Sequence, residues 1–334
     1  MGSEKSMGGE TADRAAMTFF ASAAEADRRI AGVAAAGRVV KALADGGGRE
    51  LRLAVGDGAP LARATLDDID RLRGAIAVRI VAGSALAAGD IAVPAVVPRS
   101  SWEVVRRTAK PGDGLVSRWL NRPISQRITW LLLHIPGARP IHVTVVNALL
   151  ALVMVPVLLL GGQAGLVVGG ILFHSASVLD GVDGEMARAT YRASESGAAL
   201  DSAIDMATNL LFVAAFTVAL ALRDGDEIGW IGGWALGLVI LGATLIARRV
   251  RAEGAPLGFD LLKRSGRIRG PVDVIFWVVQ TLSSRDCFAF LFMALTLVGL
   301  ERTALSIFSA VATLWFLYLL MSLIPIPRAF RGAA

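Results

Sequence analysis

The stretch of sequence that decides the fold runs from residue 179 to residue 205 and reads LDGVDGEMARATYRASESGAALDSAID. Two pairs of aspartates lie in it, Asp180 with Asp183 and Asp201 with Asp205, and the members of each pair are spaced by about one helical turn. Four further residues complete the pattern, namely Gly184, Ala187, Arg188 and Gly197. On a helix, the residues of the pattern from 180 to 188 share an arc of about 140°. A hairpin between two helices brings the second pair opposite the first, so we expect four carboxylates to converge.

Long apolar runs flank the aspartates and predict a polytopic membrane protein. The 334 residues are 54% hydrophobic and only 19% charged, with a mean hydropathy of +0.59, which is too apolar for a soluble domain of this length. Runs long enough to cross about 30 Å of hydrocarbon predict six transmembrane helices. They lie at residues 141–160, 164–184, 198–222, 228–247, 286–301 and 304–323. The fifth run is short, and its start is left open between Asp286 and the apolar stretch from Val272 to Leu282.

Basic residues gather in alternate loops, which predicts the orientation of the spans. Lys and Arg precede the first span, follow the second and fourth, and recur in the C-terminal tail, whereas the other loops carry no net basic charge. Because basic loops stay on the cytoplasmic side, both termini and the aspartates are predicted to face the cytoplasm from the cell (inner) membrane. The first twenty residues lack the apolar core of a secretory signal. The net charge is +6, and the basic residues lie between and beside the apolar spans. We therefore expect the lipid bilayer as partner and no nucleic acid.

A cytosolic domain and a juxtamembrane helix are expected before the first span. Residues 1–105 read as a small α/β domain and residues 106–334 as an all-α membrane domain. From Leu115 to Leu133, apolar residues recur every three or four positions with arginines between them, which predicts an interfacial helix. The elements expected in the first domain are Ala-rich helix at 16–44, a helical turn or two at 67–73, and short buried strands at 51–55 and 75–81.

The residue types of the pattern suit phosphoryl-type transfer. Carboxylate oxygens are the ligands that Mg²⁺ or Mn²⁺ prefer, and two such ions can share the neutralisation of a pyrophosphate. Arg188 offers a forked donor to a diphosphate, while Gly184, Ala187 and Gly197 leave room for a ligand. Simple ion pairs or helix caps are the alternative reading. Four carboxylates inside spans would then cost on the order of 10 kcal/mol, with too few nearby bases to offset them.

At all eight fixed positions the pattern resembles the signature of the CDP-alcohol phosphotransferase family, also called the CDP-alcohol phosphatidyltransferases. The resemblance covers residues 110–330. It implies a homodimeric, six-helix membrane enzyme that moves a substituted phosphate from a CDP-alcohol to an acceptor hydroxyl and releases CMP. The implied metal ligands are Asp180, Asp183 and Asp201, with Asp205 near the metals as general base, and the implied CDP pocket consists of Gly184, Ala187, Arg188 and Gly197.

One motif of the family is incomplete in this chain. Many members carry Pro-Asn-x-x-Thr at the start of the first span, where this chain has Pro-Ile-His-Val-Thr at 140–144. Thr144 keeps its place, so we expect it in the CDP pocket. Asn147 lies one turn further along.

The segment before the first span resembles one branch of the family. Lys-Pro-Gly-Asp-Gly at 110–114, followed by Ser117, Asn121 and Ser125, is similar to the di-myo-inositol-phosphate-phosphate synthases, which favours CDP-inositol as donor and an inositol phosphate as acceptor. An ordinary basic helix at the membrane surface explains the same residues. The candidates for acceptor binding are Lys110, Arg285 and Asp286, and an interfacial ion pair is the other reading of the last two.

The same branch suggests an origin for the first domain. Its enzymes are often fused to an inositol-phosphate cytidylyltransferase, and residues 16–100 resemble a shortened nucleotidyltransferase in their order of helices and strands. The glycine-rich phosphate loop of such enzymes is missing near the start. Residues 1–105 are therefore either a degenerate, inactive remnant of a nucleotidyltransferase or an unrelated cytosolic domain.

Two further functions remain open at this point. A phospholipid synthase would use CDP-diacylglycerol as donor, which the wider family and the basic cytoplasmic surface favour. A divalent-cation transporter would explain carboxylates in membrane helices, but it would not explain Gly184, Ala187, Arg188 and Gly197 at these intervals.

Overall fold

The computed structural model describes residues 16–83, 91–110, 112–253, 278 and 281–323. These residues belong to two compact units. The α/β unit holds the chain up to residue 108 together with residues 129–138 and 186–192, and the helical unit holds residues 109–128, 139–185 and those from 193 onward. The division into domains at residues 1–105 and 106–334 remains a prediction.

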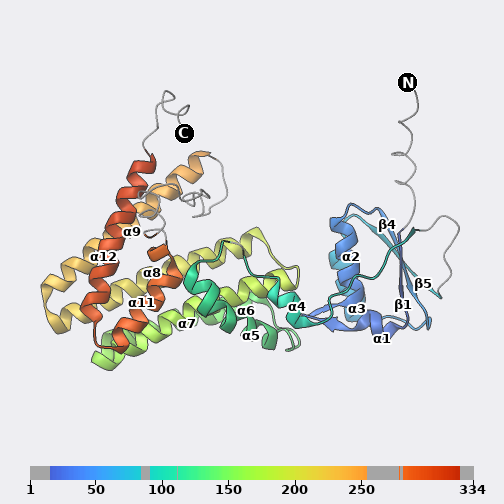
Figure 1. The fold of residues 1–334 in the computed structure, drawn as a ribbon, viewed down its shortest axis with the longest axis horizontal. Coiled ribbons are helices and arrows are strands. Elements are labelled where there is room, and N and C mark those ends of the chain that lie inside the picture. The colour runs from blue at the N-terminus through green and yellow to red at the C-terminus, as the bar shows by residue number, and fades with distance from the viewer. Residues whose placement is uncertain (1–15, 84–90, 111, 254–277, 279–280, 324–334) are drawn as a thin grey trace, which may run out of the picture. The chain divides into compact units, whose positions relative to one another are not determined.

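A parallel sheet forms the centre of the α/β unit. Its strand order is β5-β4-β1-β6, and all its pairings are parallel. The strands are β1 Ala16–Phe20, β4 Glu50–Val55, β5 Ala77–Ala82 and β6 Ile91–Ala92, and a separate antiparallel pair is formed by β2 Arg29–Ile30 and β3 Val33–Ala34. The helices are α1 Ala23–Asp27, α2 Ala35–Asp45, α3 Arg63–Leu72 and α4 Ser101–Arg106. Figure 1 shows α2 and α3 side by side next to the sheet.

The expectations for this unit are confirmed in the strands and wrong at its start. Strand β4 covers the predicted strand at 51–55, and β5 begins two residues later than predicted. The predicted helix at 16–44 is wrong over Ala16–Phe20, which is strand β1, and over Arg29–Ile30 and Val33–Ala34, which form the antiparallel pair β2–β3. Local alanine content favoured a helix there, but pairing with β4 buries Met17 and Phe20, and burial on a sheet outweighs weak local propensity. Helix α3 is longer than the predicted turn or two.

Five helices among the described residues are long and apolar enough to cross a membrane, so the protein is a multi-pass membrane protein. They are α6 Pro140–Leu160, α7 Gly162–Ala189, α8 Glu195–Asp224, α9 Asp226–Glu253 and α12 Glu301–Leu323. A further helix, α11, runs only from Arg285 to Leu297, about 20 Å along its axis. The apolar stretch from Val272 to Leu282, where we left the start of the fifth span open, lies mostly outside the described residues. The count of six spans therefore remains a prediction.

Aromatic packing explains how the short α11 is held in the helical unit. Phe292 of α11 is fully buried, and its ring packs edge-on against Phe212 at 4.9 Å and Phe216 at 5.0 Å, both from α8. Phe173 of α7 stacks on Phe212 at 3.8 Å. Buried aromatic pairs of this kind contribute beyond their buried area, so α11 is fixed against α7 and α8.

A polar cluster ties three loops of the helical unit together. Arg223 pairs with Asp224 at 2.8 Å and with Glu301 at 3.5 Å, and Arg302 pairs with Asp224 at 2.7 Å. Gln163 donates to Glu301 and accepts from Arg223. The loops between α6 and α7, α8 and α9, and α11 and α12 therefore lie at one end of this unit. These are the loops without net basic charge, which fits the predicted alternation.

The predicted juxtamembrane helix exists, and uncharged polar residues line its buried side. A π-helical turn, η1 Ser117–Asn121, continues into α5 Arg122–Leu132. Ser117, Asn121 and Ser125 are buried, whereas Trp119 is 76% exposed. Arg118 and Arg127 are exposed together with Trp119. A side that combines arginines with a large aromatic residue suits contact with the membrane surface, although the place of this helix there remains a prediction.

Candidate active site

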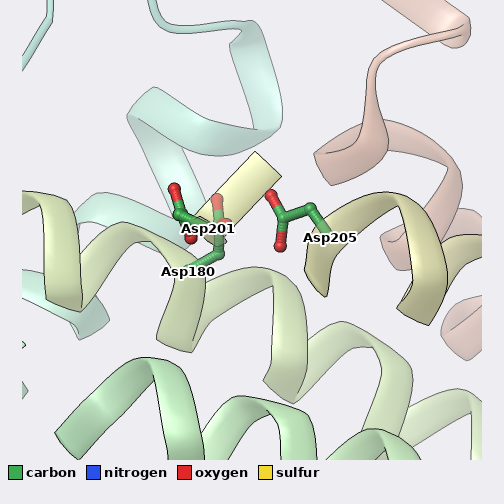
Figure 2. Close-up of side chains that lie close together, drawn as sticks. All are labelled: Asp180, Asp201 and Asp205. Carbon is green, nitrogen blue, oxygen red and sulfur yellow. The ribbon is translucent and has the colours of Figure 1, made fainter. Parts of the chain in front are cut away.

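The aspartates of the pattern meet where α7 and α8 face each other. Asp180 lies on α7, and Asp201 and Asp205 lie one turn apart on α8. One oxygen of each carboxylate lies within 4.8 Å of the others, and Figure 2 shows the three side chains converging from the two helices. Three of the four carboxylates that we expected to converge therefore do so, and their role as metal ligands remains a prediction.

Asp183 sits beside this group and is almost completely buried, at 4% exposure. The hydroxyl of Thr144 on α6 donates to its Oδ2 at 2.6 Å. Among the described residues its Oδ1 has no hydrogen-bond partner. A buried carboxylate oxygen without a donor is costly and is well suited to a cation. Thr144, expected in the CDP pocket, is here the partner that orients Asp183.

Arg285, at the start of α11, is the basic group of the cluster. Its Nη1 pairs with Asp180 at 3.0 Å and with Asp205. Its Nε and Nη2 are buried and lack hydrogen-bond partners within the described part of the chain. One guanidinium cannot balance four carboxylates, so the cluster keeps an excess of negative charge. Hard carboxylate oxygens close together, one of them unsatisfied, fit one or more Mg²⁺ or Mn²⁺ ions.

Asp286, the second residue of α11, forms hydrogen bonds outside the aspartate cluster. Its Oδ1 accepts hydrogen bonds from Asn121 of η1 at 3.0 Å and from Ser177 of α7 at 2.7 Å. These bonds fix the position of neighbouring Arg285. The role in acceptor binding that we expected for Asp286 remains a prediction, and sequence reasoning missed Ser177 altogether.

A buried ionic group lies one turn beyond Asp180 and was also missed. Glu185 is fully buried, and Arg122 of α5 pairs with it at 2.7 Å and with Asp113 through two hydrogen bonds of 2.7 and 2.9 Å. Ser125 donates to the same Glu185 oxygen at 2.7 Å. Burial opposes ionisation of both partners, but their mutual hydrogen bonds and charges prevail, so the pKa of Asp113 lies below its ordinary value and the pKa of Arg122 above it.

Gly181 allows the two helices of this group to approach. A Cβ at this position would lie 3.3 Å from Ser125 Oγ and 3.4 Å from Arg122 Nη1. The glycine therefore belongs to the packing of α5 on α7. In the sequence, Glu185 lies one position past a predicted span that ends at 184, which indicates a loop residue. Its position one helical turn after Gly181 was the signal that could have revealed it.

Residues 138–330 match the CDP-alcohol phosphatidyltransferase family. The chain belongs to this family. Similar proteins are each named "Bifunctional IPC transferase and DIPP synthase". The protein from Thermococcus kodakarensis is 37% identical over 47% of this chain and 34% of its own length. That from Aquifex aeolicus is 28% identical over 66% of this chain and 49% of its own. The protein from Rubrobacter xylanophilus is 33% identical over 50% of this chain and 36% of its own length. The chain thus spans half or less of the length of these relatives.

The remaining residues of the CDP-alcohol phosphatidyltransferase pattern have local roles in the structure. Arg188 donates from Nε to the carbonyl of Thr108 at 2.9 Å. The N–H of Gly197 donates at 3.1 Å to Ser194, the N-cap of α8, and a Cβ there would lie 2.9 Å from that hydroxyl. The roles of these residues in the CDP pocket remain predictions, as they do for half-buried Gly184 and Ala187. Lys110 is exposed, and its backbone N–H donates to Asp113 at 3.1 Å.

Proposed function

We propose that this chain transfers a substituted phosphate from a CDP-alcohol to an acceptor hydroxyl and releases CMP. The observation that carries the proposal is the convergence of Asp180, Asp201 and Asp205, with Asp183 beside them, in a chain of the CDP-alcohol phosphatidyltransferase family. A divalent-cation transporter needs the carboxylates alone. It gives no reason for the family pattern around them.

Asp180, Asp183 and Asp201 are the proposed ligands of two divalent ions, Mg²⁺ or Mn²⁺. When bound, these ions supply neutralisation of the diphosphate and polarisation of the phosphorus under attack. Support comes from the hard oxygen donors and from the unsatisfied Oδ1 of Asp183. Asp205 is the proposed general base, with an oxygen of its own close to the other carboxylates.

In the proposed reaction the acceptor oxygen forms a bond to the phosphorus that carries the alcohol, and the bond from this phosphorus to CMP breaks. Asp205 takes the proton of the acceptor hydroxyl. Arg285 has two buried N–H-bearing nitrogens without partners among the described residues, which suits a phosphate on the acceptor. Arg188, Gly184, Ala187 and Gly197 are proposed to bind the CDP group.

We further propose CDP-inositol as donor and an inositol phosphate as acceptor. The names of the similar proteins and the resemblance of residues 110–125 to di-myo-inositol-phosphate-phosphate synthases support this choice. The test uses the full chain in lipid nanodiscs with Mn²⁺ or Mg²⁺ and measures CMP release. CDP-inositol with inositol phosphate should be used faster than CDP-diacylglycerol with the same acceptor. The reverse ranking would make the chain a phospholipid synthase, and no CMP from any donor would overturn the transferase proposal.

The first prediction separates chemistry from donor binding at Asp205. In Asp205→Asn, turnover should fall by about 10² to 10⁴, the range for losing a positioned base. Donor affinity measured by calorimetry should stay within a few fold, because the three proposed metal ligands remain. Asp180→Asn is the matched comparison, since it removes a ligand from the facing helix. If Asp205→Asn lost donor binding as completely as Asp180→Asn, Asp205 would be a metal ligand and the base would lie elsewhere.

The second prediction concerns the orientation, which we propose to be cytoplasmic for the active site and both termini. In a Cys287→Ser background, a cysteine replacing exposed Glu227 should react with a membrane-impermeant maleimide added to whole cells, and one replacing exposed Ser196 should not. Gly162 and Gly225 are unsuitable labelling positions because their φ angles of 55° and 107° disfavour cysteine. The opposite labelling pattern would reverse the orientation. The proposed homodimer is a separate question for cross-linking.

A further inference from the structure

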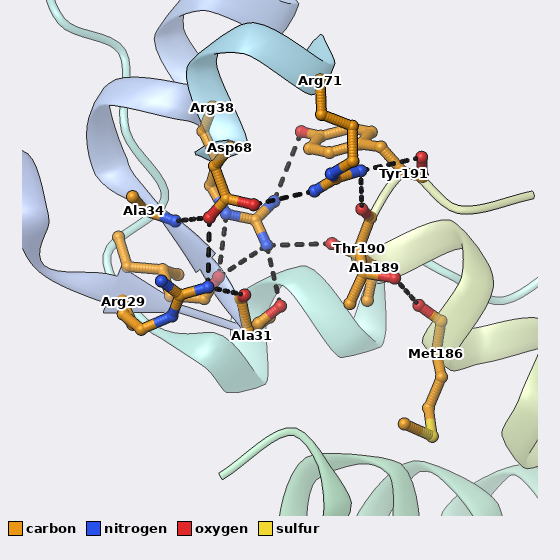
Figure 3. A network of polar contacts seen from close by, with 12 residues as sticks. Arg29, Ala31, Ala34, Arg38, Asp68, Arg71, Met186, Ala189, Thr190 and Tyr191 are labelled. Atoms are coloured by element: carbon orange, nitrogen blue, oxygen red, sulfur yellow. Dashed lines mark hydrogen bonds and ion pairs between the residues drawn. The ribbon is translucent and has the colours of Figure 1, made fainter. Parts of the chain in front are cut away.

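A polar network around Arg38 holds the C-terminal end of α7 within the α/β unit (Figure 3). Arg38 lies on α2 and is only 3% exposed. Its guanidinium donates to the carbonyls of Ile30 at 2.6 Å and Ala189 at 2.9 Å, and to the hydroxyl of Tyr191 at 3.3 Å. The guanidinium also lies 5.3 Å from the centre of the Tyr191 ring. A buried guanidinium whose N–H groups donate to backbone carbonyls stabilises the backbone arrangement that places those carbonyls around it.

A second arginine reaches the same segment from α3. Arg71 donates to the carbonyls of Thr190 at 3.1 Å and Tyr191 at 3.3 Å. Asp68 pairs with Arg71 at 3.0 Å and accepts the backbone N–H of Ala34 at 3.1 Å, which fixes the direction of Arg71. Helix ends leave their last carbonyls unpaired and carry partial negative charge. The two arginines thus cap α7 with cations that come from another part of the chain.

The turn that follows α7 is strained, which explains why it needs this cap. Tyr191 has a φ of 55°, in the left-handed region that favours glycine. The N–H of Tyr191 donates to Arg188 at 3.3 Å and the N–H of Arg192 to Ala187 at 2.8 Å, the pattern of a Schellman turn that usually has glycine in this place. A residue keeps a strained backbone conformation only where several surrounding contacts hold it in place. Arg38 and Arg71 provide such contacts through their hydrogen bonds to residues 189–191.

Among the described residues of the α/β unit, the backbone amides after strand β1 are not available to bind a nucleotide phosphate. Doubly wound sheets bind phosphates on backbone amides after the first strand. Here the N–H of Ala23 donates to both oxygens of Asp57 at 3.2 Å, and the N–H of Ala21 donates to Glu25 at 2.9 Å. The chain's own carboxylates thus occupy the amides at this edge, and they would repel a phosphate.

We propose that the α/β unit is a positioning module for the transfer reaction, in which Arg38 and Arg71 cap α7 and fix its last turns. These turns carry Gly184, Ala187 and Arg188, so the inference rests on the proposed function through their role in binding CDP. Arg38 and Arg71 bind backbone carbonyls of the α7 end and are positioning residues.

Hydrogen–deuterium exchange tests the cap without any substrate, and it is the third prediction. In Arg38→Met, the amides of Thr190, Tyr191 and Arg192, which bond to Met186, Arg188 and Ala187, should exchange about tenfold faster or more, because the turn opens locally. Arg79→Met is the matched control. Arg79 lies on β5 of the same unit with its side chain 68% exposed, and its loss should leave exchange at 190–192 unchanged.

Kinetics then test the consequence for the reaction. Arg38→Met should raise the KM for the CDP donor about tenfold and change kcat less than about threefold, because the CDP-binding turns move while the aspartates remain. Arg38→Lys should give an intermediate KM, since it keeps the charge without the fork. Adding Tyr191→Gly to Arg38→Met should return the KM to within about threefold of wild type, because glycine adopts the left-handed turn without strain.

The outcomes separate this inference from the proposed function. Unchanged exchange at 190–192 in Arg38→Met would overturn the cap. A lowered melting temperature and kcat that Tyr191→Gly does not relieve would show that Arg38 only stabilises the α/β unit, which also overturns the inference. If the wild type releases no CMP from any CDP-alcohol, the proposed function fails, whereas exchange at 190–192 still shows whether Arg38 caps α7.

Discussion

Replacement of Asp201 by asparagine should abolish measurable CMP release. Asp201 joins Asp180 and Asp205 within 4.8 Å, and the change removes one anionic oxygen from this group. The interaction of a metal with the reacting phosphate is worth several kcal/mol, and about 1.4 kcal/mol is tenfold in rate. Turnover should therefore fall by about 10³ or more. Titration with Mn²⁺, followed by electron paramagnetic resonance, should show weakened binding of the ion in the same variant.

Asp226→Asn is the control for this fourth prediction. Asp226 is an exposed carboxylate at the start of α9, at the end of the helical unit opposite the aspartate cluster. Its loss changes the net charge equally and should leave both CMP release and Mn²⁺ affinity unchanged. Normal turnover in Asp201→Asn, or equal losses in both variants, would contradict the metal assignment.

Replacement of Arg122 by methionine should strongly destabilise the helical unit. It leaves the fully buried Glu185 without its 2.7 Å ion pair, and removing one partner of a buried pair costs about 3–5 kcal/mol. For a domain of this size, that corresponds to a fall of about 10 °C in the apparent melting temperature. Thermal unfolding in detergent, followed by tryptophan fluorescence, measures this fifth prediction.

A second variant shows whether the uncompensated charge is the cause. Arg122→Met combined with Glu185→Gln removes the charge and keeps an acceptor for Ser125, so it should recover more than half of the lost melting temperature. Arg118→Met, on the same helix and exposed, should change the melting temperature little. If the double variant were less stable than Arg122→Met, side-chain packing in place of charge would explain the effect.

The aspartate cluster was predictable because it follows from helical periodicity and a single hairpin. Asp180, Asp201 and Asp205 lie on consecutive helices, so a one-dimensional pattern determines which faces meet. The residues that contact α7 beside this cluster were harder to predict from the sequence. Thr144 is 39 residues from Asp183, and Arg122 is 63 residues from Glu185. Such pairs depend on how α5 and α6 pack on α7, which local sequence does not determine.

The features of the fold that were wrong or not predicted have a related physical origin. Strand β1 is stabilised by β4, more than thirty positions away, so its alanine-rich flank misled a reading based on local propensity. The short α11 is held by Phe292 against α8, a contact that hydropathy windows cannot detect. The predicted interfacial helix was recognised from its periodicity, but which of its sides faces the protein became clear only from Asn121 and Ser125.

The polar cluster at Gln163 and Glu301 gives a reference point for the depth of the aspartate cluster along α7. From Gln163 to Asp180 there are seventeen residues of continuous α7, about 26 Å along the helix axis, against a hydrocarbon thickness of about 30 Å. If the cluster lies at one boundary of the hydrocarbon, this length of helix brings the carboxylates to the opposite head-group layer. Both a water-soluble donor and a lipid-borne one can reach that plane. Depth alone therefore excludes neither class of donor, and selection between them falls to the groups that contact the alcohol.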